Sequence, residues 1–107
     1  MTLQTVELRK DANSGEYGLV VIGGYDLNMS LYVLKLVEAG SAESDGRLVA
    51  GDEVLQVNGV NTQGLCSRDV AQAFKSSDTV VLQVRKTGLP PPSVSEVLES
   101  IKNGHRY

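Results

Sequence analysis

Short stretches of hydrophobic residues recur along the chain, and most have the length and the β-branched content of β-strands. Residues 5–9 alternate hydrophobic and polar positions with period two, as a strand with one buried face does. Residues 17–22 are almost continuously hydrophobic and end at a pair of glycines, which indicates a buried strand followed by a loop. The same reading predicts further strands at residues 31–37, at 53–57, beginning at 60–61 and at 79–85.

Two details of this pattern predict local backbone geometry. Leu31, Val33 and Leu36 can share the core face of one strand only if a β-bulge lies near residues 34–35. Asn58-Gly59 follows an alternating strand and is a strong signal for a two-residue hairpin turn.

Helical spacing appears inside this β pattern. Val70, Ala73 and Phe74 recur at intervals of three and four, so residues 67–75 should form a helix with Ser67 as its cap or first residue. The small polar residues 41–45 stand between two glycines and suit at most one short helix.

The C-terminal segment reads as a separate unit, so we divide the chain into a domain at residues 1–88 and an extension at residues 89–107. Three consecutive prolines at 90–92 enforce an extended linker. Residues 93–103 then carry a capping box and one apolar stripe, which predicts an amphipathic helix. A helix this short is marginal alone in water, so we expect it to dock on its own domain or on a second copy.

Composition narrows the function further. A chain of 107 residues with 41% hydrophobic content suits one domain with a real core. The net charge of −3 argues against nucleic acid, and we do not expect lipid binding either. The single cysteine excludes an internal disulfide and suits a cytoplasmic protein, and no metal or cofactor is expected.

Catalytic chemistry has little support. His105 is the only histidine and lies in the extension, so a Ser-His-Asp arrangement is not expected. Cys66 precedes the predicted helix but has no histidine placed to activate it. Asp52 and Glu53 are neighbours on a strand and should point to opposite faces, so they do not form an acid/base pair. The sequence therefore predicts no enzyme activity.

Gly18, where the chain turns into the apolar strand, gives the clearest hint of binding chemistry. A glycine there leaves successive backbone N–H groups free to form a concavity that favours an anion such as a carboxylate. If the following strand has a free edge, an extended peptide could add to the sheet and place its terminal carboxylate in this loop. The alternative is an ordinary tight turn that feeds a core strand.

The order of elements and two motifs resemble the PDZ domain family over about residues 5–86. Glu16-Tyr17-Gly18-Leu19 is similar to the family's Gly-Leu-Gly-Phe carboxylate loop and keeps only its second glycine. Residues 40–59 resemble the family's central signature along their whole length. The resemblance implies a mainly β (α+β) fold, with a six-stranded, partly open barrel or sandwich capped by two helices and followed by the C-terminal helical extension.

The resemblance also implies a peptide-binding site. Tyr17, Gly18 and Leu19 match the residues whose amides receive the ligand carboxylate, and Arg9 or Lys10 matches the basic residue that supports it. The groove would be lined by Val20, Val21, Leu34, Ser67, Ala71 and Phe74, with Tyr17 and Leu19 contributing to the pocket for the last ligand side chain. Ordinary core burial is the alternative for Leu19, Val21 and Phe74.

We therefore expect a non-enzymatic module of an intracellular scaffold or adaptor that binds the extreme C-terminal peptide of a partner by β-strand addition. Its ligands would be tails of membrane or signalling proteins with a hydrophobic last residue. Because Ser67 stands where many family members carry histidine, we also expect tolerance for an apolar residue two before the end. The protein would be cytoplasmic and reach membranes or junctions through its partners.

Two alternatives stay open. The domain could be the regulatory PDZ module of a larger enzyme, or an oligomerisation domain that self-associates through residues 93–107. In a related arrangement, the free carboxylate of Tyr107 would enter the groove of a neighbouring molecule.

Overall fold

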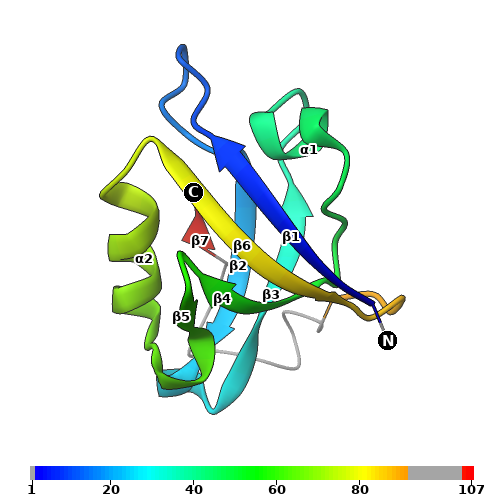
Figure 1. Ribbon diagram of the computed structural model, residues 1–107, viewed down its shortest axis with the longest axis vertical. Coiled ribbons are helices and arrows are strands. Elements are labelled where there is room, and N and C mark those ends of the chain that lie inside the picture. The colour runs from blue at the N-terminus through cyan, green and yellow to red at the C-terminus, as the bar shows by residue number, and fades with distance from the viewer. Residues whose placement is uncertain (1, 92–104) are drawn as a thin grey trace.

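The computed structural model describes residues 2–91 and 105–107, and within them it shows an antiparallel β-fold with two α-helices (Figure 1). The strands are β1 (Thr2–Arg9), β2 (Leu19–Gly24), β3 (Met29–Leu36), β4 (Glu53–Val57), β5 (Val60–Asn61), β6 (Thr79–Lys86) and β7 (His105–Arg106). The α-helices are α1 (Ser41–Asp45) and α2 (Ser67–Lys75), and two short 3-10 turns, η1 (Tyr25–Leu27) and η2 (Thr62–Gly64), complete the elements. All six expected strands of the domain and both of its helices are confirmed.

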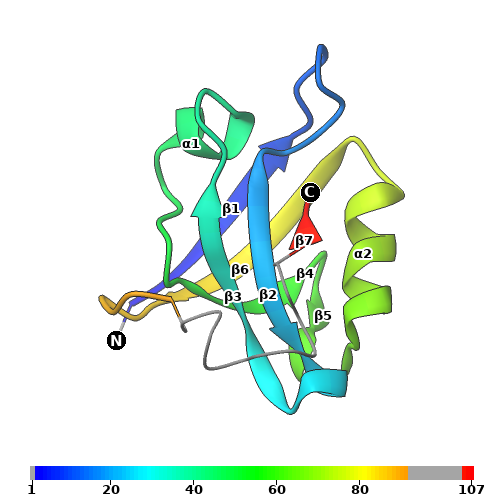
Figure 2. The ribbon, with the colours of Figure 1, turned by 180° about the vertical axis from the view of Figure 1, so that it is seen from behind.

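The sheet is open, and its strand order is β1-β6-β4-β3-β2-β7, with β5 paired to β4 outside this path. Every pairing is antiparallel. β2 therefore ends the sheet of the domain proper, and among the described residues the two-residue strand β7 alone lies beyond it. α2 runs beside β2, and β7 lies between the two (Figure 2).

The predicted β-bulge is present in β3. Val20 of β2 pairs with Lys35, but the next residue, Val21, pairs with Val33, so Leu34 is the extra residue. The shift lets Leu31 and Val33 be buried on the core face while Leu36 packs against the same core. The predicted hairpin turn is also present, because Asn58 and Gly59 both have positive φ, at 51° and 80°.

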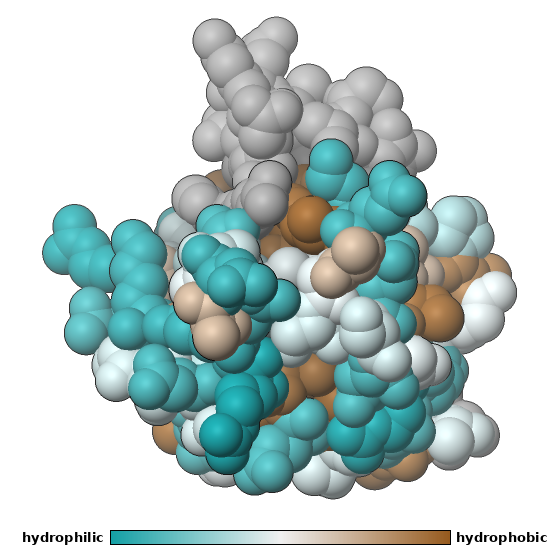
Figure 3. All heavy atoms as spheres, turned by 90° about the horizontal axis from the view of Figure 1, so that it is seen from above, coloured by the Kyte–Doolittle hydropathy of each residue, from teal (hydrophilic) through white to brown (hydrophobic). Residues whose placement is uncertain are grey.

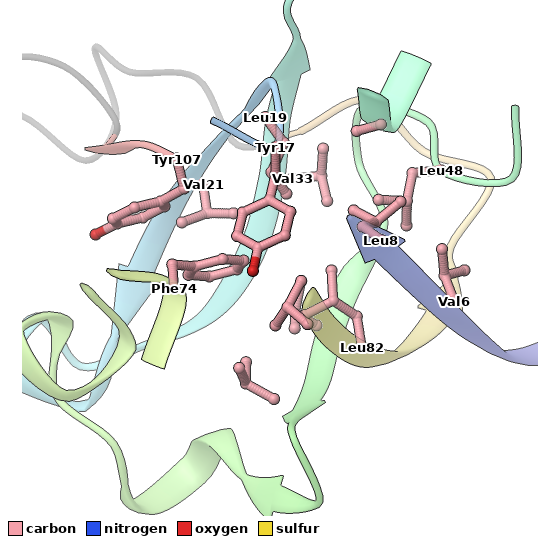
Figure 4. Packing of buried hydrophobic residues seen from close by; sticks show 14 of the residues in the cluster. Val6, Leu8, Tyr17, Leu19, Val21, Val33, Leu48, Phe74, Leu82 and Tyr107 are labelled. Carbon is pink, nitrogen blue, oxygen red and sulfur yellow. The ribbon is translucent and has the colours of Figure 1, made fainter. Parts of the chain in front are cut away.

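The hydrophobic core lies between the sheet, α1 and α2 (Figure 4). β2 is buried at every position, which explains its continuous apolar sequence. The exterior differs, since in the view from above hydrophilic residues cover most of the surface and hydrophobic ones show mainly in recesses between them (Figure 3). Within the described residues, no helix is long and apolar enough to cross a membrane.

The segment from Gly40 to Gly59, which carries the longest motif of the sequence, is a structural element. Leu48 is 1% exposed and anchors the loop between α1 and β4 in the core. Asp52 is equally buried, and its carboxylate accepts hydrogen bonds from the Lys86 ammonium at 2.6 Å and the Val49 amide at 3.0 Å. Turn geometry and one buried ion pair account for this segment.

One sequence prediction is wrong, and two others are not tested by the described residues. Gly23-Gly24 was expected to open a loop, but both residues belong to β2, where they accompany a second register shift against β3. The helix expected at residues 93–103 lies outside the described residues, so its docking stays a prediction, as does the division of the chain at residue 88.

Candidate functional site

The last residues of this chain lie between the outer edge of β2 and α2 (Figure 2). Tyr107 lines a cavity there together with Tyr17 and Phe74, and we call this region the groove. β7 pairs antiparallel with β2, with Val20 opposite Arg106 and Val21 opposite His105. The structure places this segment in the groove of its own chain, and the alternative that Tyr107 enters the groove of a neighbouring molecule stays a prediction. We call residues 105–107 the tail.

Main-chain hydrogen bonds fix the end of the tail. The main-chain oxygen of Tyr107 accepts from the amides of Gly18 at 2.8 Å and of Leu19 at 3.0 Å. The amide of Tyr107 donates back to the carbonyl of Leu19 at 2.7 Å. Two neighbouring N–H groups thus converge on one oxygen of the last residue, in the manner of an anion-binding nest.

The loop that supplies these amides is held from behind. The carbonyls of Tyr17 and Gly18 accept hydrogen bonds from Ala42 and Val37, which lie in and before α1. Because these bonds hold the carbonyls toward the α1 side, the N–H groups of Gly18 and Leu19 are left facing the groove. A Cβ on Gly18 would lie 2.9 Å from the Cα of Gly40, so the loop and the α1 region meet at two glycines.

The side chain of Tyr107 fills an aromatic pocket (Figure 4). Its ring stacks on Phe74 with a centroid separation of 4.6 Å and an interplanar angle of 8°. Tyr17 meets the same Phe74 edge-on at 5.8 Å, and its hydroxyl donates to the carbonyl of Ser77 at 2.7 Å. Burial raises the pKa of the Tyr107 phenol, and burial followed by the charge of Asp78 raises that of Tyr17.

The other expected lining residues divide between pocket and core. Leu19, Val21 and Phe74 are each at most 1% exposed and belong to the core cluster that also includes Tyr107. The pocket floor is the edge of the core, so these residues line the pocket and belong to the core at the same time. Ala71 is half-buried against this cluster from α2.

Val20 and Leu34 do not belong to that pocket. Val20 is 5% exposed but stands between two inward-facing residues of β2, so strand alternation turns it to the other face of the sheet. Leu34 is the bulge residue of β3 and is half-buried. These two residues can contact the flank of a bound strand but not its last side chain.

The head of α2 contacts a residue that the sequence analysis did not identify, Asp26. Ser67 is the first helical residue, and its hydroxyl donates to Asp26 at 2.7 Å while its amide donates to the same carboxylate at 2.9 Å. Cys66 is the N-cap and forms a capping box with Asp69. Asp26 lies 41 residues away in η1, so only the fold reveals this contact.

Of the two basic candidates, Lys10 is the one near the pocket. Its ammonium lies 5.6 Å from the Tyr17 ring centroid and 3.4 Å from the carbonyl of Lys75. Lys10 and Tyr107 also line a cavity of about 200 Å³ at the end of the groove. Arg9 does not line this cavity, and its carbonyl accepts a hydrogen bond from Ser41.

A larger cavity of about 450 Å³ lies elsewhere, between η1, η2 and the β4 region. Its only charged lining residue is Glu53, so it offers no cation to a carboxylate. Glu53 pairs with Arg85, as Asp52 does with Lys86, so each of the adjacent carboxylates has its own partner.

Comparison with known proteins agrees with this geometry. A model of the PDZ domain family matches residues 5–85. The chain is 36% identical over 95 residues to tyrosine-protein phosphatase non-receptor type 13 of Homo sapiens, in a match that covers 86% of this chain and 4% of that protein. It is 33% identical over 84 residues to human Disks large homolog 3, with 71% of this chain and 10% of that protein covered.

A third relative and a solved structure are also similar to this chain. The chain is 35% identical over 77 residues to membrane-associated guanylate kinase, WW and PDZ domain-containing protein 3 of Gallus gallus, covering 70% of this chain and 7% of that protein. A crystal structure of a Dlg1 PDZ domain from the choanoflagellate Monosiga brevicollis has the same fold, with a TM-score of 0.70 at 22% identity over 80% of this chain and 100% of that one. The chain thus spans a tenth or less of the length of these curated relatives.

Proposed function

The chain belongs to the PDZ domain family of protein-interaction modules, and we propose that it binds the extreme C-terminal peptide of a partner protein as an added strand on β2. The terminal carboxylate of the partner would take the place of the Tyr107 main-chain oxygen on the amides of Gly18 and Leu19. The single observation that carries the proposal is the tail itself, which pairs with β2 and ends on these two amides.

The physical case rests on two contributions. The free edge of β2 supplies main-chain hydrogen bonds to any extended peptide, whatever its sequence. The two converging amides supply charge-assisted hydrogen bonds, which are about twice as strong as neutral ones. Only a few side chains are buried against the cost of ordering the peptide, so we expect dissociation constants of about 1–100 μM.

The experiment compares one peptide with a free carboxylate and the same peptide with an amidated C-terminus. Both are titrated into the Tyr107→Asp variant, in which a charge in the aromatic pocket should drive the tail out of the groove. Amidation removes the charge and should weaken binding by about 1.5–3 kcal/mol. Equal affinities for acid and amide would contradict binding at the chain terminus.

The ligand residue two positions before the ligand's C-terminus should gain little hydrogen-bonding energy from Ser67. The proton of the Ser67 hydroxyl is already donated to Asp26, so this side chain offers a ligand only its oxygen as an acceptor. We therefore retain the proposal that an apolar residue is tolerated there. A Ser67→His variant should shift preference towards Ser or Thr by about tenfold or less, which corresponds to roughly one hydrogen bond.

The setting of the domain is also a proposal. The similarity to Disks large homolog 3 favours an intracellular scaffold that meets the tails of membrane or signalling proteins at junctions. The similarity to a tyrosine-protein phosphatase favours the second candidate, a regulatory module within a larger enzyme. The presence of a catalytic domain in the same polypeptide would support the second candidate, a regulatory module of an enzyme.

A further inference from the structure

The occupied groove also indicates which last residue it prefers, an inference that rests on the proposed function. We propose that this groove selects peptides that end in an aromatic residue, and that the tail of this chain is such a ligand and competes with partners for the groove.

Phe74 is the residue that would determine this specificity. The parallel arrangement of its ring and that of Tyr107, at 8°, presents a flat face to the last side chain. Tyr17 packs edge-on against Phe74 and is itself anchored through its hydroxyl to Ser77, so the Phe74 ring is supported from the side. A planar side chain can stack on this face, whereas a branched aliphatic one touches it through its methyl groups.

The outer end of the pocket suits a tyrosine in particular. The adjoining cavity is lined by Lys10, Glu16 and Lys75 in addition to the aromatic residues. A tyrosine combines an apolar body with a polar end, and the lining of this cavity offers both aromatic and charged groups. Tyr107 itself is 7% exposed.

The tail makes the contacts that the groove offers to a ligand. It has the antiparallel pairing, the main-chain oxygen on the two amides and the stacked last side chain. Residues 92–104 join it covalently to the domain, so its binding is intramolecular and an external peptide must displace a tethered competitor.

The test uses four peptides, Gly-Gly-His-Arg-Xaa with a free carboxylate, in which Xaa is Tyr, Phe, Leu or Val. They are titrated into the Tyr107→Asp variant and followed by fluorescence anisotropy. The Tyr and Phe peptides should bind about two- to tenfold more tightly than the Leu and Val peptides, as expected for an aromatic pair. A Leu or Val peptide that binds as tightly as the Tyr peptide would overturn the proposed ligand class.

A Phe74→Leu substitution in the same variant should abolish the preference for aromatic ends. Because this substitution also removes core contacts, its folding is checked by thermal unfolding. Phe74→Met, which fills a similar volume without a ring face, serves as the second variant. A retained aromatic preference in a folded Phe74 variant would show that another residue sets it.

Competition by the tail is tested with the Tyr peptide alone. The unmodified chain should bind it at least about tenfold more weakly than Tyr107→Asp does, because an intramolecular ligand reaches a high effective concentration. Leu3→Asp is the matched control, since Leu3 is 55% exposed on β1 at the opposite end of the sheet, and it should behave like the unmodified chain.

Equal affinities for the unmodified chain and Tyr107→Asp would overturn the competition. Oligomers that form at high concentration and disappear in Tyr107→Asp would place the tail in a second copy and overturn its intramolecular assignment. Neither result touches the proposed function, which fails only if acid and amide peptides bind alike.

Discussion

The segment from Gly40 to Gly59 and the loop at residues 17–19 carry the two PDZ motifs of this chain, and they differ in what they do. The first is the stronger motif in the sequence, and it holds the fold together through turns, the buried Leu48 and the Asp52–Lys86 pair. The second is short and irregular, yet its amides hold the end of the tail.

This difference has a physical cause. Backbone amides carry out the chemistry of the loop, so binding requires only that Gly18 keeps its conformation and that the buried Tyr17 and Leu19 stay packed in the core. In the longer segment the side chains themselves make the contacts, and its turns require particular residue types. A clear motif therefore indicates the family, while a weak one lies at the binding site.

The first expected effect separates the two regions by stability. An Asp52→Ala variant leaves the Lys86 ammonium and the Val49 amide without their shared acceptor and should lower the free energy of unfolding by about 2–3 kcal/mol. Urea denaturation measures this loss. Asp45→Ala is the matched control, because Asp45 belongs to a more exposed pair with Arg47 and should cost less than about 1 kcal/mol.

Peptide affinity gives the other half of that experiment. Both variants, made in the Tyr107→Asp background, should bind the Tyr peptide within about twofold of the parent, because neither residue lies at the groove. A large loss of affinity in folded Asp52→Ala would show that the structural segment also controls the site.

The next effect tests whether Gly18 is needed for conformation alone. Gly18 and Gly15 both have positive φ, at +78° and +68°, but a Cβ at Gly18 would meet the Gly40 backbone whereas one at Gly15 meets nothing within 4 Å. Both Ala variants should lose about 1–2 kcal/mol of stability from the left-handed conformation. Gly18→Ala should lose about 1–2 kcal/mol more, because packed backbone must move.

Binding distinguishes the two glycines further. Gly18→Ala should weaken binding of the Tyr peptide, since the amides of residues 18 and 19 shift with the loop. Gly15→Ala should leave this binding unchanged. Equal binding by both variants would show that the loop tolerates the displacement.

Alkaline pH should open the groove while the longer segment stays folded. Burial raises the pKa of the Tyr107 phenol above its ordinary value of 10.0, so the seated tail holds this proton more tightly than the released tail does. The stabilisation of the seated tail is therefore complete below pH 10 and is lost as pH rises towards the raised pKa. Over this range the equilibrium constant between the seated and the released tail falls by at most about tenfold per pH unit. The Cα NMR signals of Gly18 and Leu19, whose nuclei do not exchange with water, report the release.

The control for this titration is Tyr107→Phe, whose ring cannot ionise. Its tail should stay seated over the pH range in which the unmodified tail leaves. Identical titration curves for both chains would assign the change to Tyr17, whose pKa is raised by burial and by Asp78.

Much of the fold could be predicted because local pattern and packing agree. The bounds of β4 and α2 match the expected ones, and the bulge in β3 followed from three apolar residues that had to share a face. β7 could not be predicted, because two polar residues form a strand only where the edge of β2 offers them partners. The Asp26–Ser67 contact was missed for the same reason, since nothing near either residue indicates the other.

The smallest expected effect decides between the two basic candidates that the sequence left open. Lys10 borders the cavity beside Tyr107, whereas Arg9 does not. A Lys10→Gln variant in the Tyr107→Asp background should therefore weaken carboxylate peptides by about 0.5–1 kcal/mol, with a smaller loss at high salt because the ammonium is partly exposed. Arg9→Gln is the matched control and should bind like the parent. The amidated peptide should be insensitive to both changes, because it carries no terminal charge for either cation to attract. Loss of affinity in Arg9→Gln alone would transfer the supporting charge to Arg9 and leave the role of the Gly18 and Leu19 amides intact.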